Sequence, residues 1–306
     1  MPLLQIHQLH IDAQFRQTRR SIVGGLSFGV EPGERLGIVG ESGCGKTMTA
    51  LAIFGLLPSN CSAGGEVYLD RRELLSLPEG ERNRLRGTKM AYVPQSGADF
   101  LNPSLLVRTH LYETLKRTGT PKKLWPEQSL ALLRQTGFSA GGAEGVLRKY
   151  PFQISGGMAQ RVVLAMGIAA SPVLVTADEP TRGIDHGAAM EFMALLKNLF
   201  PRTAVIIITH DISAASACTQ LLVMLGGRMM EYGPVRELLT EPKHPYTQDL
   251  LAALPERGFA AAPPLNREAP GGCPFYSRCA WSSPLCAEKP PPEQSRGSWR
   301  WSCHNA

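Results

Sequence analysis

Between residues 40 and 47 the chain reads Gly40-Glu41-Ser42-Gly43-Cys44-Gly45-Lys46-Thr47, which matches the pattern G-x-x-x-x-G-K-[ST] without a gap. The glycines let the backbone curl tightly enough for its N–H groups to point at phosphate oxygens. An apolar strand, Leu36 to Val39, precedes the loop, and a helical run, Thr47 to Phe54, follows it. Lys46 is expected to neutralise the outer phosphates and the Thr47 hydroxyl to bind Mg2+. This context favours a nucleotide-phosphate loop over a plain glycine turn.

A second apolar strand, Val173 to Ala177, ends in the acidic pair Asp178 and Glu179. Taken alone, the pair would be interpreted as an acidic turn, because acids at strand ends are common. Beside a phosphate loop, we expect Asp178 to bind Mg2+ directly or through water. Glu179 is then the expected general base that polarises the attacking water.

Two more strands are followed by polar residues. Gln95 lies just past the strand Met90 to Val93, and His210 follows the strand Ala204 to Thr209. Ligands contact α/β sheets at the carboxyl ends of strands, although a lone histidine is usually structural. We expect His210 to contact the γ-phosphate, and we place it with Glu179 and Gln95 in the catalytic set. The predicted Mg2+ contacts are Thr47, Gln95 and Asp178.

Composition and pattern predict an α/β globular chain. Its 306 residues are 43% hydrophobic with a net charge of +6, which fits phosphate-bearing or anionic partners as well as an ordinary basic surface. Residues 221–225 and 228–231 read as a hairpin around Gly226-Gly227. The stretch from Leu105 to Lys149 reads as helices joined by a glycine- and alanine-rich connection, 137–145.

The chain ends in a cysteine-rich segment. No run is long and apolar enough for a membrane span, and the N-terminus does not resemble a signal peptide, so we expect a cytoplasmic chain. Disulfides are rare in that compartment, so four clustered cysteines suggest a metal site. They are Cys273, Cys279, Cys286 and Cys303. The segment follows a proline-rich linker, 255–272. It is too short for a core of its own, so it needs a cross-link such as a bound metal, or a larger surface to pack on.

Residues 150–161, Tyr-Pro-Phe-Gln-Ile-Ser-Gly-Gly-Met-Ala-Gln-Arg, resemble the signature motif of the ABC transporter ATPase family. Ser155, Gly156 and Gly157 would form an anion-binding helix start, although an ordinary N-capped helix has the same residues. The resemblance implies that this motif closes over ATP bound to a partner cassette, so that two cassettes sandwich two ATP molecules.

The family's other motifs occur in the same order along the chain. They are the phosphate loop at Gly40, the glutamine loop at Gln95, the signature at Ser155, the acidic pair Asp178-Glu179, the D-loop at Asp185 and the switch histidine His210. The resemblance implies an ABC-type ATPase domain over 1–255 with a helical subdomain at about 100–165, and a linker and extension over 256–306. It also implies an aromatic residue that stacks on adenine, for which Phe15 is the candidate.

Further features resemble the dipeptide, oligopeptide and nickel importer ATPases. These are the Met158 of the signature, the stretches 101–103 and 244–255, and the C-x5-C-x6-C spacing with a later fourth cysteine. In relatives the cysteines resemble an iron–sulfur site. Four thiolates suit a 4Fe-4S cluster or Zn2+, and the lack of C-x2-C pairs favours the cluster. Unligated thiols in a tail remain the plain alternative.

The chain also departs from the family pattern. Cys44 stands where many relatives have serine, and would make the loop sensitive to oxidation if it were exposed. Arg182-Gly183 replaces the usual D-loop residues, and Ser96 to Phe100 differs from the common run after the glutamine loop.

The resemblance implies a peripheral ATPase on the cytoplasmic face of the inner membrane. Its implied partners are a second cassette, identical or different, two membrane permease subunits and an extracytoplasmic binding protein; no nucleic acid is expected. The cargo would be peptides, nickel or a metal–chelator complex. One rival is a non-transport ABC ATPase acting on nucleic acid or ribosomes, and another is a redox-sensing module. A single cassette without sustained heptads argues against the first, and the intact catalytic set against the second.

Overall fold

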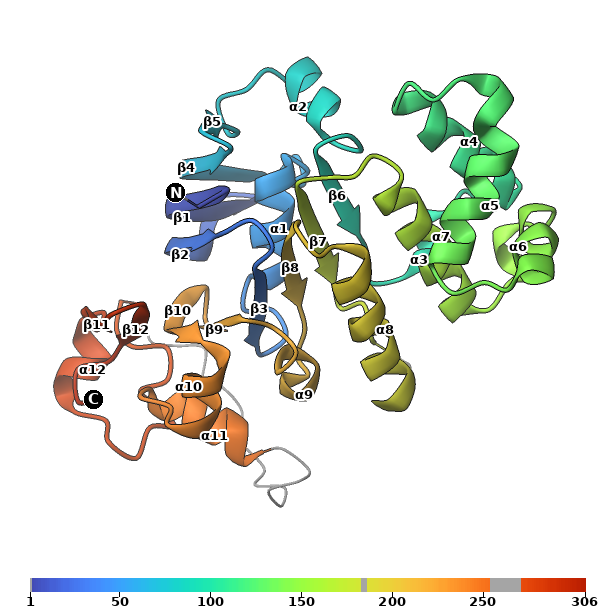
Figure 1. Ribbon diagram of the computed structural model, residues 1–306. Helices are drawn as coiled ribbons and strands as arrows, with labels where there is room; N and C mark the ends of the chain where they lie inside the picture. Colours follow the sequence, from blue (N-terminus) through green and yellow to red (C-terminus); the bar gives the residue numbers. More distant parts are fainter. Residues whose placement is uncertain (1, 183–185, 254–270) are drawn as a thin grey trace. The chain divides into compact units, whose positions relative to one another are not determined.

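The computed structural model describes residues 2–182, 186–253 and 271–306, and it divides into two compact units. The helical unit comprises Glu31–Gly33 and Ser76–Ile207, and the phosphate-loop unit comprises Pro2–Val30, Glu34–Leu75 and Ile208–Ala306. Strands and helices alternate in both, which confirms the predicted α/β class (Figure 1). No described helix combines the length and apolar character needed to cross a membrane.

The phosphate-loop unit contains most of the strands. They are β1 (Leu4–Phe15), β2 (Thr18–Val30), β3 (Arg35–Gly40), β4 (Cys61–Leu69), β5 (Arg72–Glu73), β9 (Gln220–Leu225), β10 (Arg228–Pro234), β11 (Glu293–Arg296) and β12 (Trp299–Ser302). Its helices are α1 (Lys46–Phe54), α9 (Ile212–Ala215), α10 (Val235–Thr240), α11 (Pro245–Ala252) and α12 (Pro284–Glu288). One sheet has the order β2-β1-β4-β5, and a second run of paired strands has the order β11-β12-β10-β9-β3.

The antiparallel sheet β2-β1-β4-β5 was not predicted, although β1 alternates apolar and polar residues. Its register with β2 shifts between Ile6 and Leu9, where Gln8 has a φ of 48°. Such an irregularity interrupts the period of two on which strand recognition depends. By contrast, the predicted hairpin is confirmed, with β9 and β10 antiparallel and Leu225 opposite Arg228.

The helical unit contains three strands in the order β8-β7-β6, with parallel pairing of β6 and β7. The strands are β6 (Met90–Val93), β7 (Leu174–Asp178) and β8 (Ala204–Ile208), whose last residue begins the other unit. The helices are α2 (Glu79–Leu85), α3 (Gly97–Phe100), α4 (Val107–Arg117), α5 (Trp125–Gln135), α6 (Ala140–Leu147), α7 (Gly156–Ile168) and α8 (His186–Leu199), with short 3-10 turns at Lys122–Leu124 and Pro151–Gln153. Residues of β7 and β8 are buried throughout, which is typical of parallel strands covered on both faces.

The prediction that residues 137–145 form a connection between helices is wrong, because residues 140–147 form helix α6. Ser139 caps its start, since its Oγ accepts a hydrogen bond from the Gly142 N–H at 3.2 Å. Ala143, Val146 and Leu147 are buried. Packing of this apolar face therefore overrides the poor helix propensity of the glycines.

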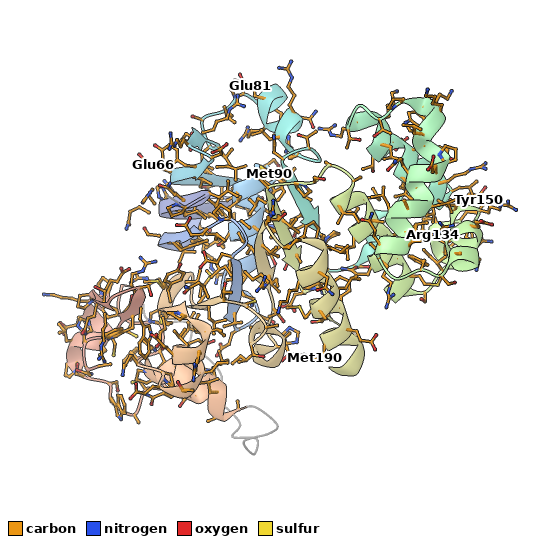
Figure 2. The ribbon with its side chains drawn as sticks, viewed as in Figure 1. Glu66, Glu81, Met90, Arg134, Tyr150 and Met190 are labelled. Carbon is orange, nitrogen blue, oxygen red and sulfur yellow. The ribbon has the colours of Figure 1, made fainter. Side chains whose placement is uncertain are left out.

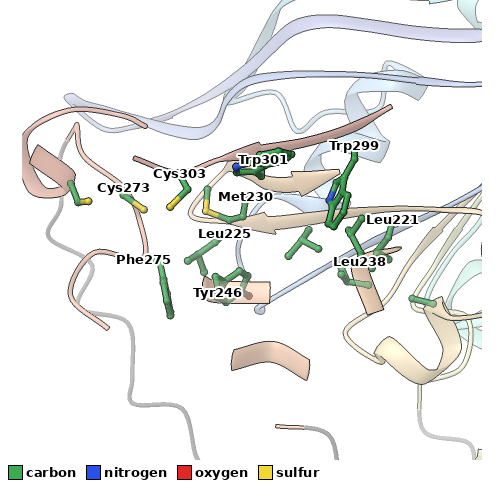
Figure 3. Close-up of a cluster of buried hydrophobic side chains, with 14 residues drawn as sticks. Leu221, Leu225, Met230, Leu238, Tyr246, Cys273, Phe275, Trp299, Trp301 and Cys303 are labelled. Carbon is green, nitrogen blue, oxygen red and sulfur yellow. The ribbon is translucent and has the colours of Figure 1, made fainter. Parts of the chain in front are cut away.

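The cysteine-rich tail packs on the rest of the phosphate-loop unit, as its short length requires. Strand β12 pairs with β10, so that Trp301 lies opposite Glu231. Trp299 and Trp301 join a buried cluster with Met230, Leu238 and Tyr246 (Figure 3). The tail therefore shares a core with the larger domain instead of building its own. The boundary at 255/256 stays a prediction, and the linker residues 254–270 lie outside the described residues.

Candidate nucleotide site

The phosphate loop joins β3 to α1, as the sequence predicts. Gly43 and Gly45 have φ angles of 79° and 100°, a region that side chains rarely adopt. A Cβ atom on Gly45 would lie 2.8 Å from Val23 Cγ2, whereas one on Gly43 would meet no protein atom within 4 Å. Gly45 therefore seats the loop on β2, and Gly43 leaves an approach open to a ligand. No side chain caps the N-terminus of α1, so its N–H groups point into the loop.

Lys46 is buried, with 6% of its surface exposed. Its Nζ donates hydrogen bonds to the carbonyls of Gly40 at 2.7 Å and Glu41 at 3.0 Å. Two carbonyl groups of the phosphate loop therefore hold the Lys46 ammonium group in place. Thr47 is exposed at the start of α1, a position suited to a metal contact.

Cys44 does not have the exposure that oxidation sensitivity requires. It is 4% exposed, and burial raises the pKa of its thiol against the opposing charge of Lys46. The expectation of a reactive thiol in the loop, which depended on exposure, therefore does not apply.

His210 and Phe15 belong to the same unit as the phosphate loop. The N–H of Thr209, the neighbour of His210, donates to the Ile38 carbonyl at 3.1 Å, which places His210 beside the end of β3. Phe15 is 51% exposed at the end of β1, at the tip of the hairpin with β2. Their predicted roles stay predictions.

The acidic pair lies in the helical unit, at the end of β7. Asp178 is 2% exposed, and the Tyr92 hydroxyl donates a hydrogen bond to its Oδ2 at 2.8 Å. Burial, with the Asp178 charge second, raises the pKa of Tyr92 well above its usual value, so the phenol stays a donor. Tyr92 was missed from the sequence, because a tyrosine within a strand carries no motif.

Glu179 has a left-handed backbone, with φ of 46°. Such a conformation costs a non-glycine residue about 1–3 kcal/mol and is concentrated at functional sites. The surrounding structure therefore holds Glu179, the predicted general base, in this conformation. Asp185 lies outside the described residues.

The signature residues begin helix α7. Ser155 is the N-cap, and its Oγ accepts from the Met158 N–H at 3.3 Å. Gly156 and Gly157 are exposed, and a Cβ atom on either would meet nothing within 4 Å. Helix α7 therefore presents uncovered N–H groups, as an anion site requires.

The glutamine loop packs against the same helix. Gln160 of α7 donates from Nε2 to the Pro94 carbonyl at 3.1 Å, and a Cβ atom on Gly97 would lie 2.6 Å from the Gln160 backbone nitrogen. Gln95, Gly156, Gly157 and Arg182 line one pocket of the helical unit. With its amide oxygen facing Arg182, Gln95 accepts a hydrogen bond from Arg182 Nε at 3.2 Å. Arg182, which departs from the family pattern, thus contacts the predicted catalytic residue Gln95.

The four tail cysteines are free thiols that line one cavity with His244 and Phe275. Burial raises the pKa of Cys273 to about 11, and the other three cysteines add to the rise because they lie close by. Among the described residues, however, no group of three or more His, Cys, Asp or Glu side chains is placed to hold a metal ion.

Two family models match the chain. The ABC transporter model covers residues 23–182, and the model of the oligopeptide/dipeptide transporter C-terminal region covers residues 230–286. The chain belongs to the ABC transporter family. The motifs of the phosphate loop, the acidic pair and the signature are therefore those of an ABC ATPase, which couples ATP hydrolysis to transport.

Named relatives of this ABC ATPase agree over nearly its whole length. It is 38% identical to the oligopeptide transport ATP-binding protein OppD of Salmonella typhimurium, over 95% of this chain and 90% of that protein. It is 36% identical to the dipeptide transport ATP-binding protein DppD of Haemophilus influenzae, over 99% and 96%. A solved dimeric ATP-binding cassette with ADP and phosphate bound matches the fold with a TM-score of 0.67, at 24% identity over 76% of this chain and 99% of that chain.

Proposed function

We propose that this chain is the ATP-hydrolysing subunit of a peptide importer. The match of residues 230–286 to the oligopeptide/dipeptide transporter C-terminal region carries the proposal, because that region lies outside the part shared by ABC ATPases in general. Nickel or a metal–chelator complex is the alternative cargo, and neither of the relatives named above favours it. Action on nucleic acid or ribosomes is likewise not favoured by the relatives.

Each site residue has a role in this proposal. The loop 40–47 binds the phosphates of ATP, with Lys46 as the cation. Thr47, Gln95 and Asp178 hold Mg2+, and Tyr92 keeps the Asp178 carboxylate oriented. Glu179 takes the proton of the attacking water, and His210 contacts the γ-phosphate. Phe15 stacks on adenine, and Asp185 of the D-loop belongs to the nucleotide-binding set.

The signature residues Ser155, Gly156 and Gly157 act on ATP bound to a second cassette, identical or different. Closure of this dimer on ATP drives two permease subunits, which receive cargo from an extracytoplasmic binding protein. The chain then works at the cytoplasmic face of the inner membrane as a peripheral subunit. Phe100, which is 51% exposed at the end of α3, offers apolar surface for the permeases, as does Tyr150 (Figure 2), whose ring stacks on that of Phe152.

Uptake by the assembled importer tests the proposal. The chain is co-expressed with its permeases, binding protein and partner cassette, and the complex is placed in liposomes with MgATP on the cassette side. A labelled peptide is expected to accumulate, and a Lys46→Ala complex is expected not to import because the phosphate contact is lost. Nickel uptake without peptide uptake would reject the peptide cargo.

We also propose that the four tail thiolates hold a 4Fe-4S cluster. A cluster bonds each thiolate to a different iron, whereas one zinc ion draws all four sulfurs to about 2.3 Å from a single point. The four thiols line one cavity, and their spacing lacks the C-x2-C pairs common in zinc sites, which supports a cluster as the shared ligand. Anaerobically purified chain is expected to contain iron and sulfide with visible absorbance, and a Cys279→Ser control is expected to lose both. Zinc without iron or sulfide would reject the cluster.

A further inference from the structure

The cysteine-bearing loop of the C-terminal extension reaches the phosphate loop. Arg278 Nη2 lies 2.6 Å from Glu41 Oε1, and the side chains are 5% and 28% exposed. A largely buried pair of this kind is far less screened than a surface ion pair, and breaking it leaves an uncompensated charge. Glu41 is the second residue of the phosphate loop, so the contact bears directly on the loop.

Tyr246 makes a second contact with Glu41. The Glu41 backbone N–H donates to the Tyr246 hydroxyl at 3.2 Å, and Tyr246 is 1% exposed in helix α11. The carbonyl of Glu41 in turn accepts from Lys46 Nζ at 3.0 Å. Glu41 therefore joins the extension, through its side chain, and helix α11, through its N–H, to Lys46, the predicted phosphate-binding lysine.

The Arg278 side chain is itself held by its surroundings. Its guanidinium carbon lies 5.1 Å from the centre of the Phe275 ring and 5.8 Å from that of the Tyr246 ring. The backbone N–H of Arg278 donates to the Phe275 carbonyl at 3.0 Å, in the turn between Cys273 and Cys279. Planar stacking and an ion pair suit arginine better than lysine.

We propose that Arg278, with Tyr246, is a positioning residue for nucleotide binding. The pair holds Glu41 so that the loop backbone and Lys46 are already arranged for the phosphates. Preorganisation of a loop strengthens binding by reducing the ordering that binding must impose. Arg278 touches neither ATP nor the reacting atoms in this account; it acts through Glu41. The extension is thereby part of the nucleotide site and more than a docking surface.

Steady-state ATPase kinetics of the assembled complex test this role. In Arg278→Ala, the KM for ATP is expected to rise about tenfold while kcat stays within about twofold, because ground-state and transition-state binding are weakened alike. The matched control is Arg300→Ala. Arg300 also pairs with a carboxylate of the extension, Glu293 at 3.2 Å, and lies over an aromatic ring, Tyr232, but it makes no contact with the phosphate loop. Arg300→Ala is expected to leave the KM unchanged.

A double-mutant cycle separates positioning from simple stabilisation. The affinity of the full chain for MgATP is measured for Arg278→Lys, Glu41→Gln and the double variant, all of which keep the side-chain size close to the original. If Arg278 acts through Glu41, the double variant binds no more weakly than the weaker single variant. Additive losses in affinity, or a lowered unfolding temperature with unchanged MgATP affinity in the Arg278 variants, would overturn the proposal.

Discussion

Cys44, Glu179 and Arg182 show how far single residues can be interpreted from sequence. The identity of Glu179 marks it as a base, but its left-handed φ of 46° appears only in the structure. Exposure of Cys44 depends on packing, which no local pattern encodes. The contact of Arg182 with Gln95 is also tertiary, because it joins residues far apart in sequence. The type of each residue therefore predicted what chemistry its side chain can do. Its exposure, backbone conformation and contacts could be read only from the folded chain.

Thiol reactivity tests the description of the phosphate loop. Iodoacetamide attacks thiolates, so burial that raises a thiol pKa protects it. Burial raises the pKa of Cys44 and brings that of Cys218 to about 12, whereas Cys61 is partly exposed. At pH 8 the thiolate fraction of Cys218 is then about one in ten thousand. Mass spectrometry is expected to find Cys61 modified first, with all three modified in urea. Equal rates for Cys44 and Cys61 in the native chain contradict this burial.

At the scale of elements, apolar runs and loop motifs predicted β3, β6, β7, β8 and the β9–β10 hairpin, because each is a continuous buried run or is bounded by glycine. Strand β1 was missed where its irregular register breaks the alternation, and α6 was missed because glycine lowers helix propensity. The short length of the tail predicted that it must pack on the surface of a larger domain. Its pairing with β10 could not be predicted, since the partner strand lies far away in sequence.

Trp299 anchors the tail through a buried carboxylate. Glu231 is fully buried and accepts hydrogen bonds from Trp299 Nε1 at 2.8 Å and from the N–H groups of Lys243 and His244. Trp299→Phe removes one donor from this buried charge, and we expect a loss of about 1–3 kcal/mol in the free energy of unfolding. Chemical denaturation measures the loss.

The control for that prediction is Trp281→Phe, in the same extension, where the ring is 50% exposed. Its effect is expected to be within about 0.5 kcal/mol, as for most surface substitutions. Equal stability of the Trp299 and Trp281 variants would show that the tail does not depend on the Glu231 contact.

At the scale of the whole molecule, the motifs of an ABC ATPase are divided between the two compact units, with the phosphate loop and His210 in one and Gln95, the signature and the acidic pair in the other. In the proposed function the signature acts on ATP bound to the partner cassette, so one chain would hold half of each of two sites.

The isolated chain is therefore expected to be a poor ATPase. Its rate per chain should rise as the partner cassette is added and then reach a plateau, because association completes both sites. A dilution series with phosphate release as the readout measures this. A rate that stays constant across dilution and ignores the partner contradicts shared sites.

Hydrolysis by Glu179→Gln tests the central claim, that this chain is an ATPase whose general base follows β7. The complex carrying Glu179→Gln is expected to bind MgATP with unchanged affinity, because the phosphate loop and Asp178 are intact. Its rate of phosphate release is expected to fall by about 100-fold or more, the usual contribution of a general base. Wild-type turnover in that variant would contradict the account.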